Sequence, residues 1–380
     1  MKIIFDLSVC IIVFCIIAFV FLALAPVHVK TKSLRAIWLI LIIGLAIFAF
    51  YSEPSPSDDL YRHYDFVQQM QQGKMSINDN VLLGFMLLCW LAAKLGNPGW
   101  LPLISTILFG LFVNGIVGYY VKENKLSRKS VILFYFCVFS YVGVFPLISG
   151  IRNALISAMV MYAYIKYYKN NKFKYYLLCL TACTVHVVGV FLIILIFLYH
   201  RFIECRWKTK EIIFMISSVA ILRIFISTGL ISSFAGMLPG DYGALLSSKI
   251  DGYLSFVGTR FYGIRLFFLV LSYLILIICL LYAMYKKYKN NMLIYFFTFV
   301  ALGAGMEMIT DRLIMCMGLL SLPIIDTLIS KNNRMKQWIF TIMLLMGFGM
   351  IIFFSSYSMF SHIQFNGHNY RIFFARLLGK

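Results

Sequence analysis

Long apolar blocks separated by short polar segments make up most of the chain. Most blocks run for about 17 to 25 residues, the length that an α-helix needs to cross a hydrocarbon core about 30 Å thick. A transmembrane β-barrel would instead show apolar and polar residues alternating over segments of about ten residues. The pattern therefore predicts an all-α fold, a polytopic integral membrane helical bundle without a separate soluble domain.

About ten of the blocks are long enough to be simple spans. The first ends in Ala-Leu-Ala, as a signal-peptidase site does, but its apolar run is too long for a signal peptide and Pro26 follows. We therefore expect an uncleaved first span and treat residues 1–380 as a single transmembrane domain. The predicted spans are 3–25, 36–51, 100–121, 130–149, 152–168, 211–234, 264–285, 291–309, 312–330 and 336–356.

The charge of the chain predicts its topology. The chain is 62% apolar and 13% charged, and 34 Lys and Arg against 14 Asp and Glu give a net charge of +20. In membrane proteins such an excess collects in cytoplasmic loops, and no soluble fold is left here to present it to nucleic acid. With ten crossings and these basic loops in the cytoplasm, both termini are external. The loops predicted to be cytoplasmic lie within 30–35, 122–129, 166–174, 201–210, 286–289 and 331–336.

The opposite charge balance marks the external side. Residues 51–80 carry five acidic and two basic residues, so we predict that they are external. The next apolar segment, Val81–Leu95, cannot be a simple span, because the flanking loops require an odd number of crossings before residue 122. We expect it to lie along the outer interface or to dip in and return, so that 51–99 forms an external loop with an interfacial helix. Residues 235–263 are a second predicted external loop, and 357–380 an external interfacial tail.

A second apolar segment, Tyr175–Tyr199, is long enough to cross the membrane, yet basic loops flank it on both sides. A re-entrant hairpin that turns near Thr184, Val185 and His186 satisfies the charge rule. Such a break survives at membrane depth only where protein or a wet cavity surrounds it. The alternative is an ordinary span with one loop that violates the rule.

Short motifs argue against several kinds of chemistry. The nine cysteines lie almost entirely in apolar blocks without a CxxC spacing, so we expect small core residues rather than disulfides or metal ligands. Asp58, Asp59 and Asp65 match no known metal-ligand spacing. The GxSxG, HExxH and P-loop motifs do not occur, and we predict neither a metal nor a cofactor.

Arginines near the outer ends of predicted spans are the strongest candidates for a site. Charged groups in or beside spans are costly unless paired or hydrated, and the positive-inside bias makes arginine unusual on the outer side. Guanidinium groups bind phosphate through bidentate hydrogen bonds, so several together suit an amphiphile with a pyrophosphate head. Local pairing is the alternative, for example Arg312 with Glu307 or Asp311 at a predicted external turn. The arginines are Arg152, Arg223, Arg260, Arg265 and Arg312.

A histidine and an acidic segment complete the candidate site. In hydrocarbon His186 would be a neutral, hydrogen-bonded core residue, whereas at a hairpin turn beside a cavity its imidazole could accept a proton from a hydroxyl nucleophile. Residues 57–66, which include His63, mix carboxylates, a guanidinium and aromatic rings, as sugar-binding sites do, although a solvated loop has the same composition. The candidate substrate contacts besides these five arginines are Asp58, Asp59, Arg62, Tyr64, Glu307 and Asp311.

Several of these segments together resemble a known family. They look like the EpsG-like branch of Wzy-type polysaccharide repeat-unit polymerases, over about residues 50–330. Where this family often has a polar residue after the histidine, the chain has Val187-Val188-Gly189. The matching motifs are Asp58-Asp59-x-x-Arg62-x-Tyr64, Gly150–Leu155 at the opening of a span, Leu177–Leu198 centred on Thr184-Val185-His186, and Asp311-Arg312 in a region with a span ending near Pro323.

The resemblance implies a metal-independent membrane glycosyltransferase with a GT-C-like helical fold in the bacterial inner membrane, its active site facing the periplasm or exterior. Members join oligosaccharide repeats carried on polyprenyl pyrophosphate, such as undecaprenyl pyrophosphate, into O-antigen or capsular polysaccharide. The pyrophosphate clamps would then be Arg152, Arg260, Arg265 and Arg312, with Arg152 and Arg312 as catalytic residues. His186 would be a general base or an acceptor-orienting group. The bilayer, a chain-length regulator and a flippase are further candidate partners.

Three other functions fit a membrane bundle of this composition. A flippase or transporter of the same lipid-linked glycan would have two homologous halves, and the sequence shows no internal repeat. A membrane acyltransferase that decorates the glycan would also use an intramembrane histidine. A structural assembly protein would tolerate the loss of every charged residue named above.

Overall fold

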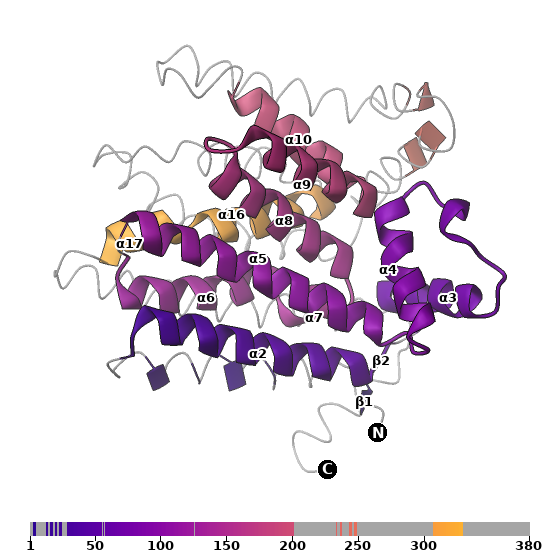
Figure 1. Cartoon of the computed structure of the whole chain (residues 1–380), viewed down its shortest axis with the longest axis horizontal. Coiled ribbons are helices and arrows are strands. Elements are labelled where there is room, and N and C mark those ends of the chain that lie inside the picture. Colours follow the sequence, from indigo (N-terminus) through magenta and orange to yellow (C-terminus); the bar gives the residue numbers. More distant parts are fainter. Residues whose placement is uncertain are drawn as a thin grey trace.

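The computed structural model is almost entirely helical where it describes the chain (Figure 1). The described residues are 29–54, 56, 58–124, 126–200 and 307–329, with isolated positions between 3 and 24 and between 233 and 248. Among them, extended pairing is limited to two residues each of β1 (Ile3–Ile4) and β2 (Ser52–Glu53), which run parallel. The prediction of a helical protein is therefore confirmed for this part of the chain.

Three helices coincide with predicted spans to within a few residues. They are α2 (Thr31–Tyr51), α5 (Trp100–Asn124) and α8 (Ile151–Tyr167). By length and composition, Thr31–Tyr51 and Trp100–Glu123 could cross a membrane. The total number of spans and the GT-C-like arrangement stay predictions.

In the core of the described bundle, α2 packs on α5 and on α6 (Arg128–Val142) (Figure 1). Trp38 of α2 is fully buried, and its ring stacks on Tyr135 of α6 with 4.3 Å between ring centroids. Its indole nitrogen donates to the carbonyl oxygen of Gly110 in α5 at 2.9 Å. A Cβ at Gly110 would lie 2.3 Å from Ile42, so only glycine lets α5 approach α2 this closely.

The predicted span 130–149 consists of two helices rather than one. α6 ends at Val142, and the short helix α7 (Val144–Ile148) follows a single residue, Gly143. Gly143 has φ of 75°, a left-handed conformation that a side chain would strain. Its amide still donates to the carbonyl oxygen of Phe139 at 2.8 Å, which completes the last turn of α6 before the break.

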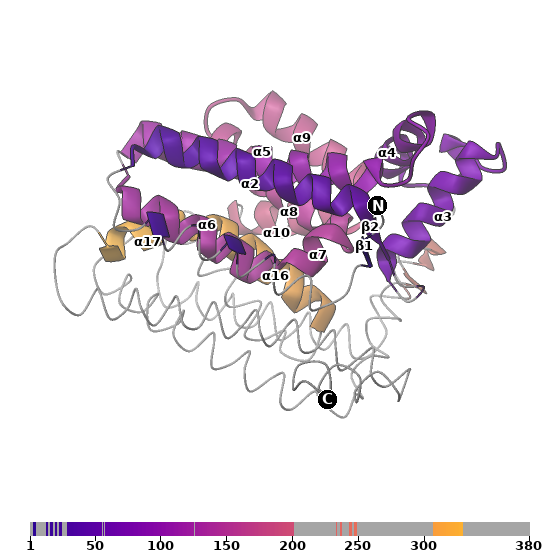
Figure 2. The same ribbon diagram turned by 90° about the horizontal axis from the view of Figure 1, so that it is seen from below.

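The predicted turn between spans 291–309 and 312–330 was wrong. Helix α16 (Glu307–Leu320) runs through it, so Asp311 and Arg312 lie within a helix and not in a turn. The chain breaks later, at Ser321, and α17 (Leu322–Ile329) follows. α16 packs on α6 and α8, and α17 packs on α6 (Figure 2). Asp326 of α17 accepts hydrogen bonds from the amide of Ser127 at 3.0 Å and the hydroxyl of Ser130 at 2.6 Å, and so secures the start of α6.

Residues 172–198 form a helical pair, α9 (Lys172–Val185) and α10 (Val188–Leu198), whose two ends return to one place. The ring of His200, after α10, stacks on Tyr168, before α9, with 3.7 Å between centroids and 11° between ring planes. The pair turns at His186 and Val187, within the segment predicted to break. Whether it is re-entrant with respect to a bilayer stays a prediction.

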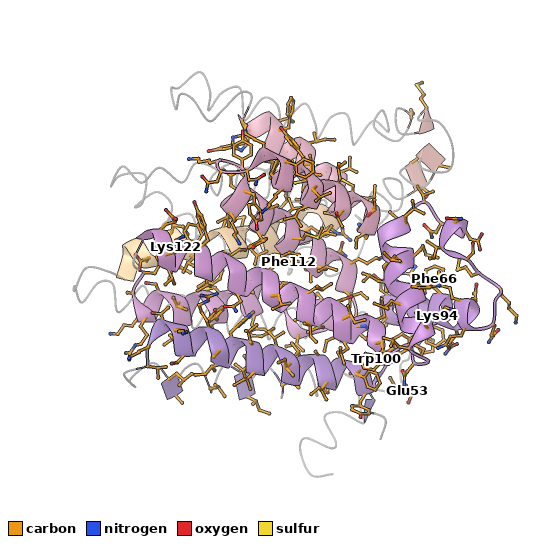
Figure 3. The ribbon with its side chains drawn as sticks, viewed as in Figure 1. Glu53, Phe66, Lys94, Trp100, Phe112 and Lys122 are labelled. Atoms are coloured by element: carbon orange, nitrogen blue, oxygen red, sulfur yellow. The ribbon has the colours of Figure 1, made fainter. Side chains whose placement is uncertain are left out.

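At one end of the bundle, α3 (Asp59–Gln71), the single 3-10 turn η1 (Ile77–Asp79) and α4 (Leu83–Lys94) form a separate cover. α4 runs across the direction of α2 and α5 in Figure 1. Phe66, Lys94 and Trp100 lie at this end, and Lys122 lies at the opposite end (Figure 3). The segment carrying Asp59, Arg62 and Tyr64 is therefore a helix rather than the loop that we expected.

The remaining predicted segments fall outside the described residues, apart from isolated positions. They are the spans 3–25, 211–234, 264–285 and 336–356, the loop 235–263 and the tail 357–380.

Candidate functional site

The candidate site is built around the first turn of α8, where Arg152 is directed toward α4. Its guanidinium carbon lies 4.7 Å from the centroid of the Phe85 ring, which is almost fully buried. A guanidinium over an aromatic face is held by the negative face of the ring. This contact directs the guanidinium toward the first half of α4.

Helix α3 brings a histidine and an ion pair to the same place. The His63 ring is 2% exposed and meets Phe85 edge to face, with 4.8 Å between centroids. One turn earlier, the Asp59 carboxylate forms a salt bridge with Arg62, three residues on. The pair is solvent-accessible, with 41% of the Asp59 side chain exposed. α3, α4 and α8 therefore meet around one buried aromatic ring.

The carboxylate of Asp59 is kept ionised by its surroundings. Burial acts to raise its pKa, but the Arg62 guanidinium, through charge and a hydrogen bond, and the charges of His63 and Arg152 outweigh it. The net result is a pKa below the ordinary value of 3.8. An ionised carboxylate accepts hydrogen bonds and repels phosphate, so it suits a sugar hydroxyl rather than a pyrophosphate.

The second arginine reaches the start of α8 from the other side. Arg312 of α16 is 8% exposed, and its Nε donates to Oδ1 of Asn153 at 2.8 Å. Asn153 follows Arg152 directly, so consecutive residues of α8 contact α4 through Arg152 and α16 through Asn153. The amide acceptor orients the guanidinium of Arg312. The structure therefore brings both catalytic candidates among the described arginines to one helix turn.

His186 lies at the end of α9 and is 6% exposed. Its Nδ1 accepts a hydrogen bond from the backbone amide of Val188 at 3.1 Å. A neutral imidazole that accepts at Nδ1 carries its proton on Nε2 and donates from there. This contact favours the acceptor-orienting role of His186 over the general-base role.

The hairpin turn carrying His186 is close to the helical cover. A Cβ at Gly84 of α4 would lie 2.3 Å from the hydroxyl oxygen of Thr184, two residues before His186. Gly84 is followed directly by Phe85, which contacts Arg152. The α4 helix therefore contacts both the hairpin turn and Arg152.

The structure describes two other candidates on α3 or at its start. The Tyr64 hydroxyl donates to the backbone oxygen of Ser52 at 3.3 Å and so fixes α3 to the end of α2, and burial raises its pKa. Asp58, at the start of α3, is 3% exposed. The side chains of Glu307 and Asp311, and all of Arg223, Arg260 and Arg265, lie outside what the structure describes.

Three residues of the candidate site, Phe85, Asn153 and His63, were missing from the set predicted from the sequence. Phe85 carries no charge, so a search for ionisable groups passes over it. Asn153 had a signal in its position beside Arg152, but an amide in an apolar helix has no distinctive pattern. His63 was visible in the acidic segment, yet helical spacing was needed to place it beside Asp59.

No three His, Cys, Asp or Glu side chains of the described part are arranged to hold a metal ion.

The comparisons with known proteins agree with the sequence resemblance. The family model described as EpsG family matches residues 35–370, which is nearly the whole chain. No curated protein matches the chain. No solved structure matches it either. The chain belongs to the EpsG family, whose members are Wzy-type polymerases, and its apolar helices fit a membrane-embedded protein of polysaccharide biosynthesis.

Proposed function

We propose that the chain joins polyprenyl-pyrophosphate-linked oligosaccharide repeat units into an O-antigen or capsular polysaccharide, at the outer face of the bacterial inner membrane. The observation that carries the proposal is the meeting of Arg152, Arg312 and the Asp59–Arg62 pair around the start of α8. Guanidinium groups suit the pyrophosphate of the donor, and the ionised Asp59 suits a hydroxyl of the acceptor sugar.

In the proposed reaction, one acceptor hydroxyl oxygen bonds to the anomeric carbon of the donor. The bond between that carbon and the pyrophosphate oxygen breaks, and the bonding electrons leave with the pyrophosphate. The hydroxyl proton passes to the departing pyrophosphate, because a phosphate oxygen with a pKa of about 6 is a stronger base than an aspartate with a pKa near 4. No metal or cofactor takes part in the proposed step.

The protein contributes charge stabilisation and orientation. Negative charge grows on the pyrophosphate as the bond breaks, and Arg152 and Arg312 stabilise it at that moment, when a preorganised donor is most effective. His186 orients the acceptor. Arg260 and Arg265 are proposed as further pyrophosphate clamps, and Arg223 as a further substrate contact.

The test is a reconstituted assay of Arg152→Ala. The purified variant, in nanodiscs with lipid-linked repeats, should form polymer about a hundredfold more slowly than the wild type. Elongation at the normal rate would remove Arg152 from the mechanism. Movement of the lipid-linked repeat across vesicles without polymer would favour a flippase, and incorporation of label from an acyl donor would favour an acyltransferase.

A further inference from the structure

An open groove of about 830 Å³ lies between the end of α3, η1 and the second half of α4. Ligand sites for small molecules have volumes of about 300 to 1,000 Å³, so the groove is large enough for a short oligosaccharide. We infer that it is a second glycan-binding site, which holds a segment of the growing polysaccharide beside the reaction site. This inference rests on the proposed function for the identity of the chain that is held.

The lining of the groove has the chemistry that binds sugars. One wall is Trp90, whose side chain is 39% exposed and offers an indole face to the apolar side of a sugar ring. Gln71, Ser76 and Asn78 line the groove as exposed polar residues. Within the described chain no side chain or backbone group hydrogen-bonds to the amides of Gln71 and Asn78, so they are available to hydroxyls. Lys94 is the one charged residue of the lining, with its Nζ 5.8 Å from the centroid of the Trp90 ring.

The groove and the candidate site lie on the same two helices. α3 carries Asp59, Arg62 and His63 in its first half and Gln71 at its end. α4 carries Phe85 near its start and Trp90 and Lys94 near its end. A glycan segment in the groove would therefore lie along the cover that also presents Arg152 with its aromatic partner. A held chain would remain near the site between successive additions.

Lipid is the competing occupant, and the structure separates the two. The exposed leucines of α4, which include Leu83, Leu87 and Leu91, form an apolar strip suited to lipid. None of them lines the groove. The groove instead combines exposed amides, a hydroxyl and one indole face with the apolar side chains of Met70, Met75, Ile77 and Ala93. Its single cation, and the lack of a guanidinium among its lining residues, fit a sugar better than a phosphate headgroup.

Binding is tested with the full chain in nanodiscs and a defined probe. The probe is the surface glycan of the source organism, released from its lipid by mild acid. The glycan should change the Trp90 part of the fluorescence, isolated by subtracting the Trp90→Phe spectrum. Trp90→Ala and Asn78→Ala should each weaken binding about tenfold, as expected for a central aromatic or hydrogen-bonding contact. Two controls should bind as the wild type does: Tyr51→Ala, at a comparably exposed aromatic outside the groove, and Leu87→Ala.

Unchanged binding in Trp90→Ala and Asn78→Ala would overturn the inference. Quenching of Trp90 by dibrominated phosphatidylcholine, together with no response to the glycan, would overturn it in favour of lipid. In the polymerisation assay, Trp90→Ala should shorten the products and leave the rate of the first bond unchanged. Arg152→Ala should do the reverse, losing bond formation and keeping glycan binding. Failure of the proposed function would leave the Trp90-dependent binding intact, so the two failures can be told apart.

Discussion

Asn153→Asp tests whether Arg312 binds phosphate. The change keeps the size of the side chain and its acceptor oxygen, which lies 2.8 Å from Nε of Arg312, but replaces a neutral amide with a carboxylate. For charges about 4 Å apart at an effective dielectric constant of about 20, the attraction is on the order of 4 kcal/mol. A pyrophosphate would have to compete with this ion pair for a guanidinium that is 8% exposed.

We expect Asn153→Asp to raise the KM for the lipid-linked donor between about tenfold and a hundredfold, because each factor of ten corresponds to about 1.4 kcal/mol. Its thermal stability should equal or exceed that of the wild type. Asn153→Ala should instead lose about 1.5 to 3 kcal/mol of stability with the hydrogen bond to a charged group. Steady-state kinetics and thermal unfolding of the same nanodisc preparations measure both quantities.

The bundle provides a matched control in a second Asn–Arg contact. Nε of Arg35 donates to Oδ1 of Asn114 at 2.9 Å, between α2 and α5. Asn114→Asp introduces the same carboxylate beside an arginine outside the candidate site, so it should leave the KM unchanged. A normal KM in a folded Asn153→Asp protein, or an equal rise in Asn114→Asp, would refute the role of Arg312.

Further predictions concern the other contacts of the cover. Arg152→Lys keeps the charge but loses the planar, bidentate fork, so its rate of polymer formation should fall between those of the wild type and Arg152→Ala; a rate equal to the wild type would show that charge alone suffices. Gly84→Ala places a Cβ 2.3 Å from a side chain of α9 and should cost about 1 to 3 kcal/mol of stability in thermal unfolding. Gly44→Ala is the control, because its added Cβ has nothing within 4 Å and should leave stability unchanged. Equal melting temperatures of the two variants would contradict the close packing at Gly84. Asp59 has a lowered pKa in the folded state, so its contribution to stability is present above pH 3.8 and is lost as the pH falls through the lower folded value. Unfolding of the wild type and Asp59→Asn should therefore differ at pH 6 and converge in acid, and a difference that persists in acid would argue against the ion pair.

The positions of the long helices were predictable because their physical cause is local. α2, α5 and α8 each coincide with one apolar block bounded by charged or turn-forming residues. The break at His186 and Val187 also had a sequence signal, since basic loops flank the segment on both sides. In each case the signal is either the burial of an apolar block or the preferred side of a charged loop. Both depend only on residues within about one helix length of each other.

The sequence alone could not predict features that depend on tertiary neighbours. Gly143 divides a block that is apolar on both sides of it, and nothing in the pattern marks its left-handed conformation. The helical form of α3 was missed because its acidic, aromatic composition also fits a loop. Phe85 and Asn153 gain their roles from contacts with Arg152 and Arg312, which are distant in sequence. Charge and hydropathy identified the arginines, but only packing assigned their partners.

Reconstitution of the purified chain with one kind of lipid-linked repeat tests the central claim most directly. The claim is that arginines gathered at the start of α8 promote transfer of a glycan from polyprenyl pyrophosphate to a sugar hydroxyl. The account predicts a ladder of products spaced by one repeat, with one polyprenyl pyrophosphate released for each bond, and loss of both signals in Arg152→Ala. A folded chain that consumes no lipid-linked repeat, or an Arg152→Ala protein that builds the same ladder at the same rate, would contradict it.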